Sequence, residues 1–382
     1  MYLLTKEQEK LRSELREFVD SEVCPVASDL DKIGTFPRDL YLRIGQLGYL
    51  DAAFEYNGTG AKYGSIEGSI IIEELSRGLA SLGLIVSPHY QCSELIAAAG
   101  SEALKKEVIE PARRGELLFA FAITEESGGS DALGVDTIAV KDGDRWILNG
   151  KKCWITNAGV ADGYIVTAKS PSAERSRSMS LFYVSKDAPG FKVVENSHII
   201  GLRNSPMGEI IMDDCAIPDY CLIGPENDCY PLIKPLLNEG RLDMTAVAVG
   251  ISQAALELAV SRAGESGLYG RSLASYQGVS FPIADIYTKT MISRNSLYSV
   301  ASLMASGLPH TRDAAAVKIF ATESCCQICK AACQIYGAYG LSSEASVNRL
   351  FRDAQTLTVS EGTSEICRIV VSNGLRNSLN KK

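Results

Sequence analysis

The chain is 382 residues long, and 46% of them are hydrophobic and 22% charged, which is typical of a soluble globular protein of roughly two or three domains. Its formal net charge is −8 without any block of lysine and arginine, which argues against a nucleic-acid partner. No stretch approaches the roughly 18 apolar residues of a membrane span. The N-terminal segment also lacks the basic start and apolar centre of a signal peptide. We therefore expect a cytoplasmic protein without membrane contact.

The first third of the chain, residues 1–115, shows apolar residues at helical spacing between clusters of glycine and proline. Thr5 followed by Gln8 is typical of a capping box, which predicts that the first helix begins there. This segment is therefore predicted to form an N-terminal helical domain.

Residues 116–225 change to short alternating runs of apolar and polar residues. Asp142-Gly143 and Asn149-Gly150 both lie between strand-like segments and are typical of hairpin turns. We predict a small antiparallel, barrel-like β domain in this part of the chain.

Helical spacing returns in residues 226–382, with long segments rich in small residues at 246–262, 283–305 and 314–336. These segments predict a four-helix bundle that packs against itself and against other subunits. The fold class is therefore α+β, and mostly α, in the order helices, sheet, helices.

Eleven cysteines occur in the chain, and the tightest group is Cys325, Cys326, Cys329 and Cys333. They recur every three or four residues, which puts them on one face of a helix. Zinc is one interpretation, but only His310 lies nearby in sequence. We favour small thiols packed in a helix interface and expect no metal.

Three polar segments are candidates for chemistry. Glu361 lies between an apolar run and a Gly-Thr turn, which suits a base in a partly dry pocket, although glutamate before glycine is also common at helix ends. Residues 124–131 form a turn rich in backbone N–H groups and hydroxyls that can bind a heteroaromatic edge or a phosphate, or are a plain strand-to-loop junction. Trp154 either covers a ring system or belongs to the core.

Together these segments resemble the acyl-CoA dehydrogenase family over essentially the whole chain. The resemblance is carried by residues 121–131, by 149–158, by 334–340 with Arg352-Asp353, and by 360–366. It implies FAD chemistry on an acyl thioester, in which Glu361 removes the α-proton while the β-hydrogen leaves as hydride to the flavin. The product would be a trans-2-enoyl thioester, with an electron-transfer flavoprotein as acceptor and a homotetramer as the assembly.

The same resemblance assigns binding roles by position. FAD would be held by Phe121, Ile123, Thr124, Gly129, Ser130, Trp154, Thr156, Tyr269, Thr363 and Glu365, and its adenylate half by Gln277, Gln334 and Gly337 of a neighbouring subunit. Ser130 and Arg241 match the thioester-side positions, although Arg241 could equally form a surface ion pair. The acyl group would meet residues around 87–95 and 239–244, which do not define its length and leave branched, cyclic or aminoacyl groups open.

Three positions depart from the family pattern. Ser266 stands where an arginine that contacts the FAD pyrophosphate is expected, and Arg262 or Arg271 would have to replace it. Glu126 replaces the usual proline of the turn after Thr-Glu. Ser360 replaces a frequent aromatic residue beside the base.

The leading hypothesis is an acyl-CoA dehydrogenase, and its closest rival performs the same chemistry on an acyl group tethered to a carrier protein. An oxidase that uses oxygen as acceptor is a further alternative. A non-catalytic relative is disfavoured because Glu361 is present, and a DNA-binding one because no basic stripe occurs.

Overall fold

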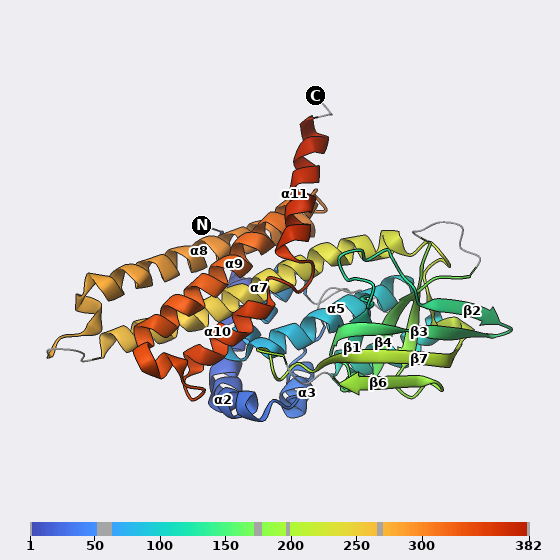
Figure 1. Cartoon of the computed structure of the whole chain (residues 1–382), viewed down its shortest axis with the longest axis horizontal. Helices are drawn as coiled ribbons and strands as arrows, with labels where there is room; N and C mark the ends of the chain where they lie inside the picture. The colour runs from blue at the N-terminus through green and yellow to red at the C-terminus, as the bar shows by residue number, and fades with distance from the viewer. Residues whose placement is uncertain (1, 52–62, 172–177, 196–198, 266–269, 380–382) are drawn as a thin grey trace.

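The computed structural model describes residues 2–51, 63–171, 178–195, 199–265 and 270–379. Its elements follow the predicted order of helices, sheets and helices, so the predicted fold class is confirmed. The two small sheets lie at one end of the molecule, and the long C-terminal helices extend away from them (Figure 1).

The N-terminal part is helical, as predicted. At its start, Gln8 N donates to Thr5 Oγ1 at 3.2 Å and Thr5 N donates to Gln8 Oε1 at 3.0 Å, which confirms the capping box. Two of its helices, α4 and α5, lie almost entirely in the core. The helices are α1 (Lys6–Phe18), α2 (Cys24–Ile33), α3 (Arg38–Gln46), α4 (Ser65–Gly78), α5 (Ala80–Ala99) and α6 (Glu102–Arg113), with a π-helical turn at Val19–Val23.

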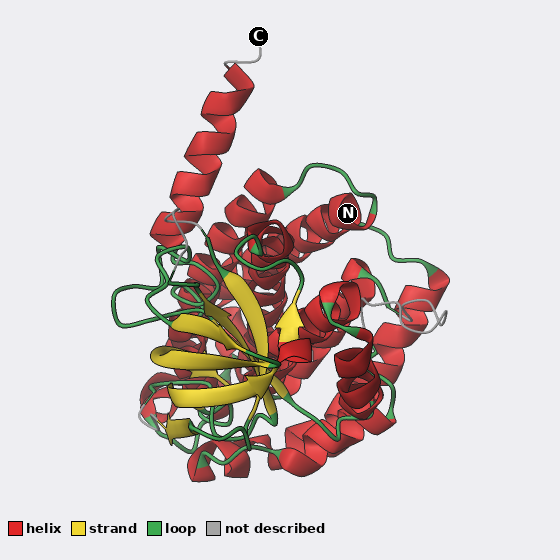
Figure 2. Cartoon of the chain, turned by 90° about the vertical axis from the view of Figure 1, so that its right-hand side faces the viewer, coloured by secondary structure: helices red, strands yellow, loops and turns green. Residues whose placement is uncertain are grey.

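The β region consists of two four-stranded sheets, ordered β1-β4-β5-β8 and β2-β3-β7-β6, which lie together in Figure 2. The strands are β1 (Phe119–Ala122), β2 (Ile138–Asp142), β3 (Arg145–Thr156), β4 (Gly163–Ala168), β5 (Ser180–Ser185), β6 (Phe191–Glu195), β7 (Met207–Pro218) and β8 (Leu222–Ile223).

Two details of the predicted β domain are wrong. The sheet is not purely antiparallel, because β1 and β4 run parallel; the chain between them crosses to the other sheet and back, which allows both strands to run in one direction. Asn149-Gly150 is not a hairpin turn but a bulge inside β3, where the register shifts between Leu148 and Gly150. The predicted turn at Asp142-Gly143 does join β2 to β3.

The C-terminal part contains α7 (Tyr230–Gly264), α8 (Gln277–Ala305), α9 (Thr311–Tyr336), α10 (Ser346–Thr356) and α11 (Ser364–Leu379). The three long helices begin earlier than predicted, and the extra turns contain Pro235 in α7 and Pro282 in α8, each of which removes one backbone hydrogen bond from its helix. By length and composition α7 is the one described helix able to cross a membrane, but 61% of its apolar window is buried inside the structure, as in a core helix.

Two cysteines of α9 pack against α10. Cys326 Sγ donates to Ala354 O at 3.2 Å, and Cys333 Sγ donates to Val347 O at 3.4 Å. Cys325 and Cys329 are buried in the same helix. The predicted role of these thiols in a helix interface is therefore confirmed.

Candidate active site

Glu361 lies in the short loop between α10 and α11, in the left-handed region with φ 52°. This conformation is rare for a residue with a side chain and costs about 1–3 kcal/mol. The side chain of Lys318, fully buried on α9, compensates by donating from Nζ to Gly362 O at 2.7 Å and to Thr358 O at 3.3 Å. The loop is thus clamped on both sides of Glu361, which fixes the direction of its carboxylate.

The carboxylate of Glu361 lies directly against Gly240 of α7. A methyl group at Gly240 would overlap Glu361 Oε2, and it would also touch Gln91 Nε2, which comes from α5. The carboxylate of Glu361 can therefore occupy this position only because residue 240 is a glycine. Burial raises the pKa of the Glu361 carboxyl, and the nearby cations of Arg241 and Lys318 partly oppose that shift.

Arg241 is buried one residue after Gly240, with 7% of its surface exposed. Its Nη1 donates to Asn238 Oδ1 at 2.8 Å, and the Asn238 amide donates in turn to Thr311 Oγ1 at 3.0 Å. The alternative of a surface ion pair is therefore wrong. Arg241 lies near Glu361 and supplies positive charge to the same site.

A second group of predicted residues meets where β1 ends. Thr124 follows β1, and its carbonyl accepts from Cys153 N on β3 at 2.9 Å, which places Trp154 beside the loop. Trp154 is 61% exposed and has φ 57°, so its alternative role as a core residue is wrong. Gly129 lies against the Thr124 side chain. The structure thus brings Thr124, Gly129 and Trp154 close together. The other predicted sheet-side residues lie on the same segments: Phe121 in β1, Ile123 directly after it, Ser130 next to Gly129, and Thr156 at the end of β3.

A buried ion pair holds this loop, and sequence reasoning assigned it no role. Lys152 Nζ donates to Glu125 Oε1 at 2.6 Å and to Thr167 Oγ1 at 2.9 Å. Glu125 also accepts from Thr137 N at 3.0 Å and from Asp136 N at 2.5 Å. The lysine cation and these donors lower the pKa of Glu125, although burial opposes them. The signal that could have revealed this ion pair is the position of Glu125 within residues 121–131, one of the segments that resemble the family.

The remaining predicted positions are distributed differently. Thr363 lies in the Glu361 loop and accepts from Ile366 N at 3.3 Å, and Glu365 is exposed in the first turn of α11. Gln277, Gln334 and Gly337 are exposed at the end of the helical bundle far from the sheets, where α8 begins and α9 ends (Figure 1). One chain therefore does not bring them to Trp154. Tyr269 and Ser266 lie outside the described residues.

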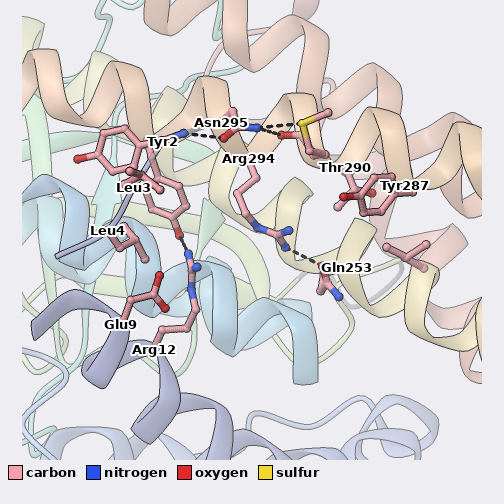
Figure 3. A pocket seen from close by; sticks show the side chains of 13 residues that line it. Tyr2, Leu3, Leu4, Glu9, Arg12, Gln253, Tyr287, Thr290, Arg294 and Asn295 are labelled. Atoms are coloured by element: carbon pink, nitrogen blue, oxygen red, sulfur yellow. Dashed lines mark hydrogen bonds between the residues drawn. The ribbon is translucent and has the colours of Figure 1, made fainter. Parts of the chain in front are cut away.

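A cavity of about 280 Å³ lies elsewhere, between α1, α7 and α8 (Figure 3). Its polar side chains bond mainly to one another: Arg12 Nη2 donates to Tyr298 OH at 2.7 Å, and Arg294 Nη2 donates to Gln253 Oε1 at 2.8 Å. Tyr2 N donates to Asn295 Oδ1 at 2.9 Å, which ties the N-terminal segment to α8. We therefore interpret this cavity as part of the structural core and assign it no ligand.

Comparisons with known proteins agree with the architecture. Family models of the N-terminal, middle and C-terminal domains of acyl-CoA dehydrogenases match residues 5–116, 120–215 and 230–375. The short-chain specific acyl-CoA dehydrogenase of Clostridium acetobutylicum is 34% identical, over 97% of this chain and 98% of that protein. The chain therefore belongs to the acyl-CoA dehydrogenase family.

Two solved structures extend this comparison. The butyryl-CoA dehydrogenase of Megasphaera elsdenii superposes with a TM-score of 0.93 at 30% identity and covers 98% of this chain and 99% of its own. PigA, solved with FAD and proline, superposes with a TM-score of 0.92 at 25% identity and the same coverage.

Proposed function

We propose that this protein is an FAD-dependent enzyme that removes two hydrogens from the α and β carbons of an acyl thioester, with Glu361 as the base. The observation that carries the proposal is the placement of Glu361. Its carboxylate is fixed by a clamped left-handed turn, lies against a glycine of α7 and has a raised pKa. A base for a weakly acidic carbon acid needs both a fixed direction and a pKa near neutrality.

The chain offers residues that suit FAD. Trp154 presents an exposed aromatic face beside the hydroxyls and backbone of the loop from Thr124 to Ser130, and this combination fits a flat ring with polar edges. Thr156, Thr363 and Glu365 would contact the cofactor on its other sides. When bound, FAD supplies the acceptor for the β-hydride.

Glu361 would take the α-proton onto its carboxylate. Arg241 and Lys318 keep enough of this carboxylate ionised, while burial keeps it basic. The backbone N–H of Glu361 would polarise the thioester carbonyl and so acidify the α-carbon. Ser130 and Arg241 would line the thioester side, and the product would be a trans-2-enoyl thioester.

The distant residues support an oligomer. Gln277, Gln334 and Gly337 would hold the adenylate half of a neighbouring subunit's FAD, because they are exposed and lie far from Trp154 of their own chain. Helix α11 projects from the body and exposes Ile369 and Leu375, an apolar surface that a second subunit would cover (Figure 2). We propose a homotetramer that passes its electrons to an electron-transfer flavoprotein.

The test is the visible spectrum of the purified protein before and after anaerobic addition of acyl-CoAs of increasing length. We expect a flavin spectrum that is bleached by at least one of them. A Glu361→Gln variant should keep the flavin and lose the bleaching by a factor of about 10² to 10⁴. If the protein keeps its flavin but is bleached only by a carrier-bound thioester, then its substrate is an acyl group on a carrier protein and not an acyl-CoA. Protein that takes up no FAD would contradict the proposal.

A further inference from the structure

Helices α5 and α7 face each other beside Glu361 with several carboxyl groups on their facing sides. Asp243 comes from α7 and accepts from Ser87 Oγ of α5 at 2.7 Å. Glu239 of α7 lies within hydrogen-bonding reach of Glu94 of α5. Glu239 and Asp243 are one helical turn apart, and Gly240, which contacts the Glu361 carboxylate, lies between them.

Within the described residues these carboxyl groups form no ion pairs of the kind that usually hold buried acids, although His310 opposes the rise in the pKa of Glu239. Among the residues that the structure describes, none of Glu94, Glu239 and Asp243 forms an ion pair within 4.0 Å. Burial and mutual repulsion raise the pKa of Glu94 to about 9, and the pKa values of Glu239 and Asp243 are also raised. Glu94 and Glu239 can share a proton with each other, whereas Asp243 has only the Ser87 hydroxyl.

Gln91 provides an independent sign of a polar ligand at this place. It is 2% exposed, and its Nε2 has no hydrogen-bond partner within the described part of the chain. This nitrogen lies against Gly240, next to the Glu361 carboxylate. A side-chain amide nitrogen is a hydrogen-bond donor, and a buried donor without a partner is unfavourable, so a polar atom of a ligand is expected beside it.

A purely hydrocarbon acyl chain between α5 and α7 would leave these polar groups less well satisfied. It would bury the Asp243 carboxyl more deeply and bring no partner for it beyond the Ser87 hydroxyl. We propose that the acyl group of the substrate carries a protonated amine, which pairs with the Asp243 carboxylate between α5 and α7. This inference rests on the proposed function and narrows its substrate to cationic, amine-bearing acyl thioesters.

The spacing suits an amine at the end of a short chain. Asp243 lies three residues along α7 from Gly240, which is roughly 4.5 Å along the helix axis. The four bonds from the α-carbon to the nitrogen of a 5-aminopentanoyl group span roughly 5 Å when extended. With its α-carbon near Glu361, such a group could bring its ammonium to Asp243, while the Glu94 and Glu239 pair adds negative potential nearby.

The experiment uses three CoA thioesters that differ only at the chain end: 5-aminopentanoyl-CoA, hexanoyl-CoA and 5-hydroxypentanoyl-CoA. Binding to the FAD-loaded Glu361→Gln variant is measured by calorimetry at pH 6.5, where the amine is charged and no turnover is expected. Bleaching of the unmodified holoenzyme is measured in parallel. We expect the amine to bind at least about 30-fold more tightly than hexanoyl-CoA, because a hexanoyl chain would leave the Asp243 charge without a cationic partner.

A second substitution, Asp243→Asn, should remove that preference in the Glu361→Gln background and leave hexanoyl-CoA binding within about threefold. The matched control is Glu14→Gln on α1, whose side chain is 54% exposed. Equal or better binding of hexanoyl-CoA, or a preference for the hydroxyl, would overturn this inference while hexanoyl-CoA bleaching left the proposed function intact. If the holoenzyme is bleached by none of the three, nor by the acyl-CoA series or a carrier-bound thioester, the proposed function fails and the inference falls with it.

Discussion

Two buried acidic regions of this protein are built in opposite ways. In the first, Glu73 of α4 accepts from Arg294 Nε at 2.8 Å and from Tyr298 OH at 2.5 Å, with Arg12 nearby. These partners lower the pKa of Glu73 in spite of its burial. In the second, Asp243 has one hydrogen-bond partner among the described residues, the hydroxyl of Ser87. Burial raises the pKa of the Asp243 carboxyl.

This difference in partners distinguishes a buried acid that stabilises the fold from one that is available to a ligand. A buried acid whose oxygens all accept hydrogen bonds from the protein needs no further partner from a ligand. A buried acid without a cation destabilises the fold, and such groups gather at sites that bind or react. Substitutions in the two regions should therefore change stability in opposite directions.

The largest expected effect is that of Glu73→Gln, which would leave Arg294 without its buried counter-charge. We expect a loss of about 3–5 kcal/mol in the free energy of unfolding at pH 7. Because the folded pKa of Glu73 is lowered, its stabilising contribution is present at neutral pH and disappears as the pH falls through that pKa. Denaturant unfolding at several pH values measures both effects.

The control for this prediction is Glu14→Gln, at an exposed position on α1, which should change stability by less than about 0.5 kcal/mol. A Glu73→Gln variant as stable as this control would show that the arginine cluster contributes little and would remove the contrast between the two regions.

The next prediction concerns Gly240→Ala, which would push the Glu361 carboxylate out of its position. We expect a loss of about 100-fold in kcat/KM, equal to about 2.7 kcal/mol, with bound flavin retained. The matched control is Gly68→Ala in α4, where an added methyl group meets no atom within 4 Å. Rates are measured by anaerobic flavin reduction, and a Gly240→Ala enzyme as fast as the control would refute the contact.

The sequence predicted the architecture well because helical spacing and the order of the parts are properties of the chain itself. It also indicated Glu361 as the base, because a motif marks that position, and this role stays a prediction. It could not predict the bulge at Gly150, since a local turn pattern is overridden when β3 pairs with β7. Nor could it show that Gln91, Gly240 and Asp243 lie near Glu361, because helix packing brings together residues that are far apart in the sequence.

A smaller effect is expected from Lys318→Met, which removes a cation beside Glu361. That cation lowers the pKa of Glu361, so its removal should raise the pKa, and the rise of kcat/KM with pH should move to higher pH. At pH values below this rise, kcat/KM should fall about tenfold for every pH unit by which the rise moves. The control is Lys330→Met, at an exposed position of the same helix. An unchanged pH profile would show that Lys318 acts through the loop backbone alone.

The smallest effect, and the one opposite in sign to Glu73→Gln, is expected from Glu94→Gln. The pKa of Glu94 is raised to about 9, so the folded state binds a proton that the unfolded state releases above pH 4.5. Stability is therefore lost as the pH rises between these values, and that loss should be absent in the variant, whose amide donates permanently to Glu239. Because Glu94 is only partly buried and shares its proton with Glu239, we expect only part of the full effect of this pKa shift, a gain of about 1 kcal/mol at pH 8 and almost none at pH 5, measured by denaturant unfolding. Asp243, which acts on Glu94, and His310, which acts on Glu239, remain in both proteins. A gain that does not depend on pH would mean that Glu94 is already ionised and paired, and the two acidic regions would then be alike.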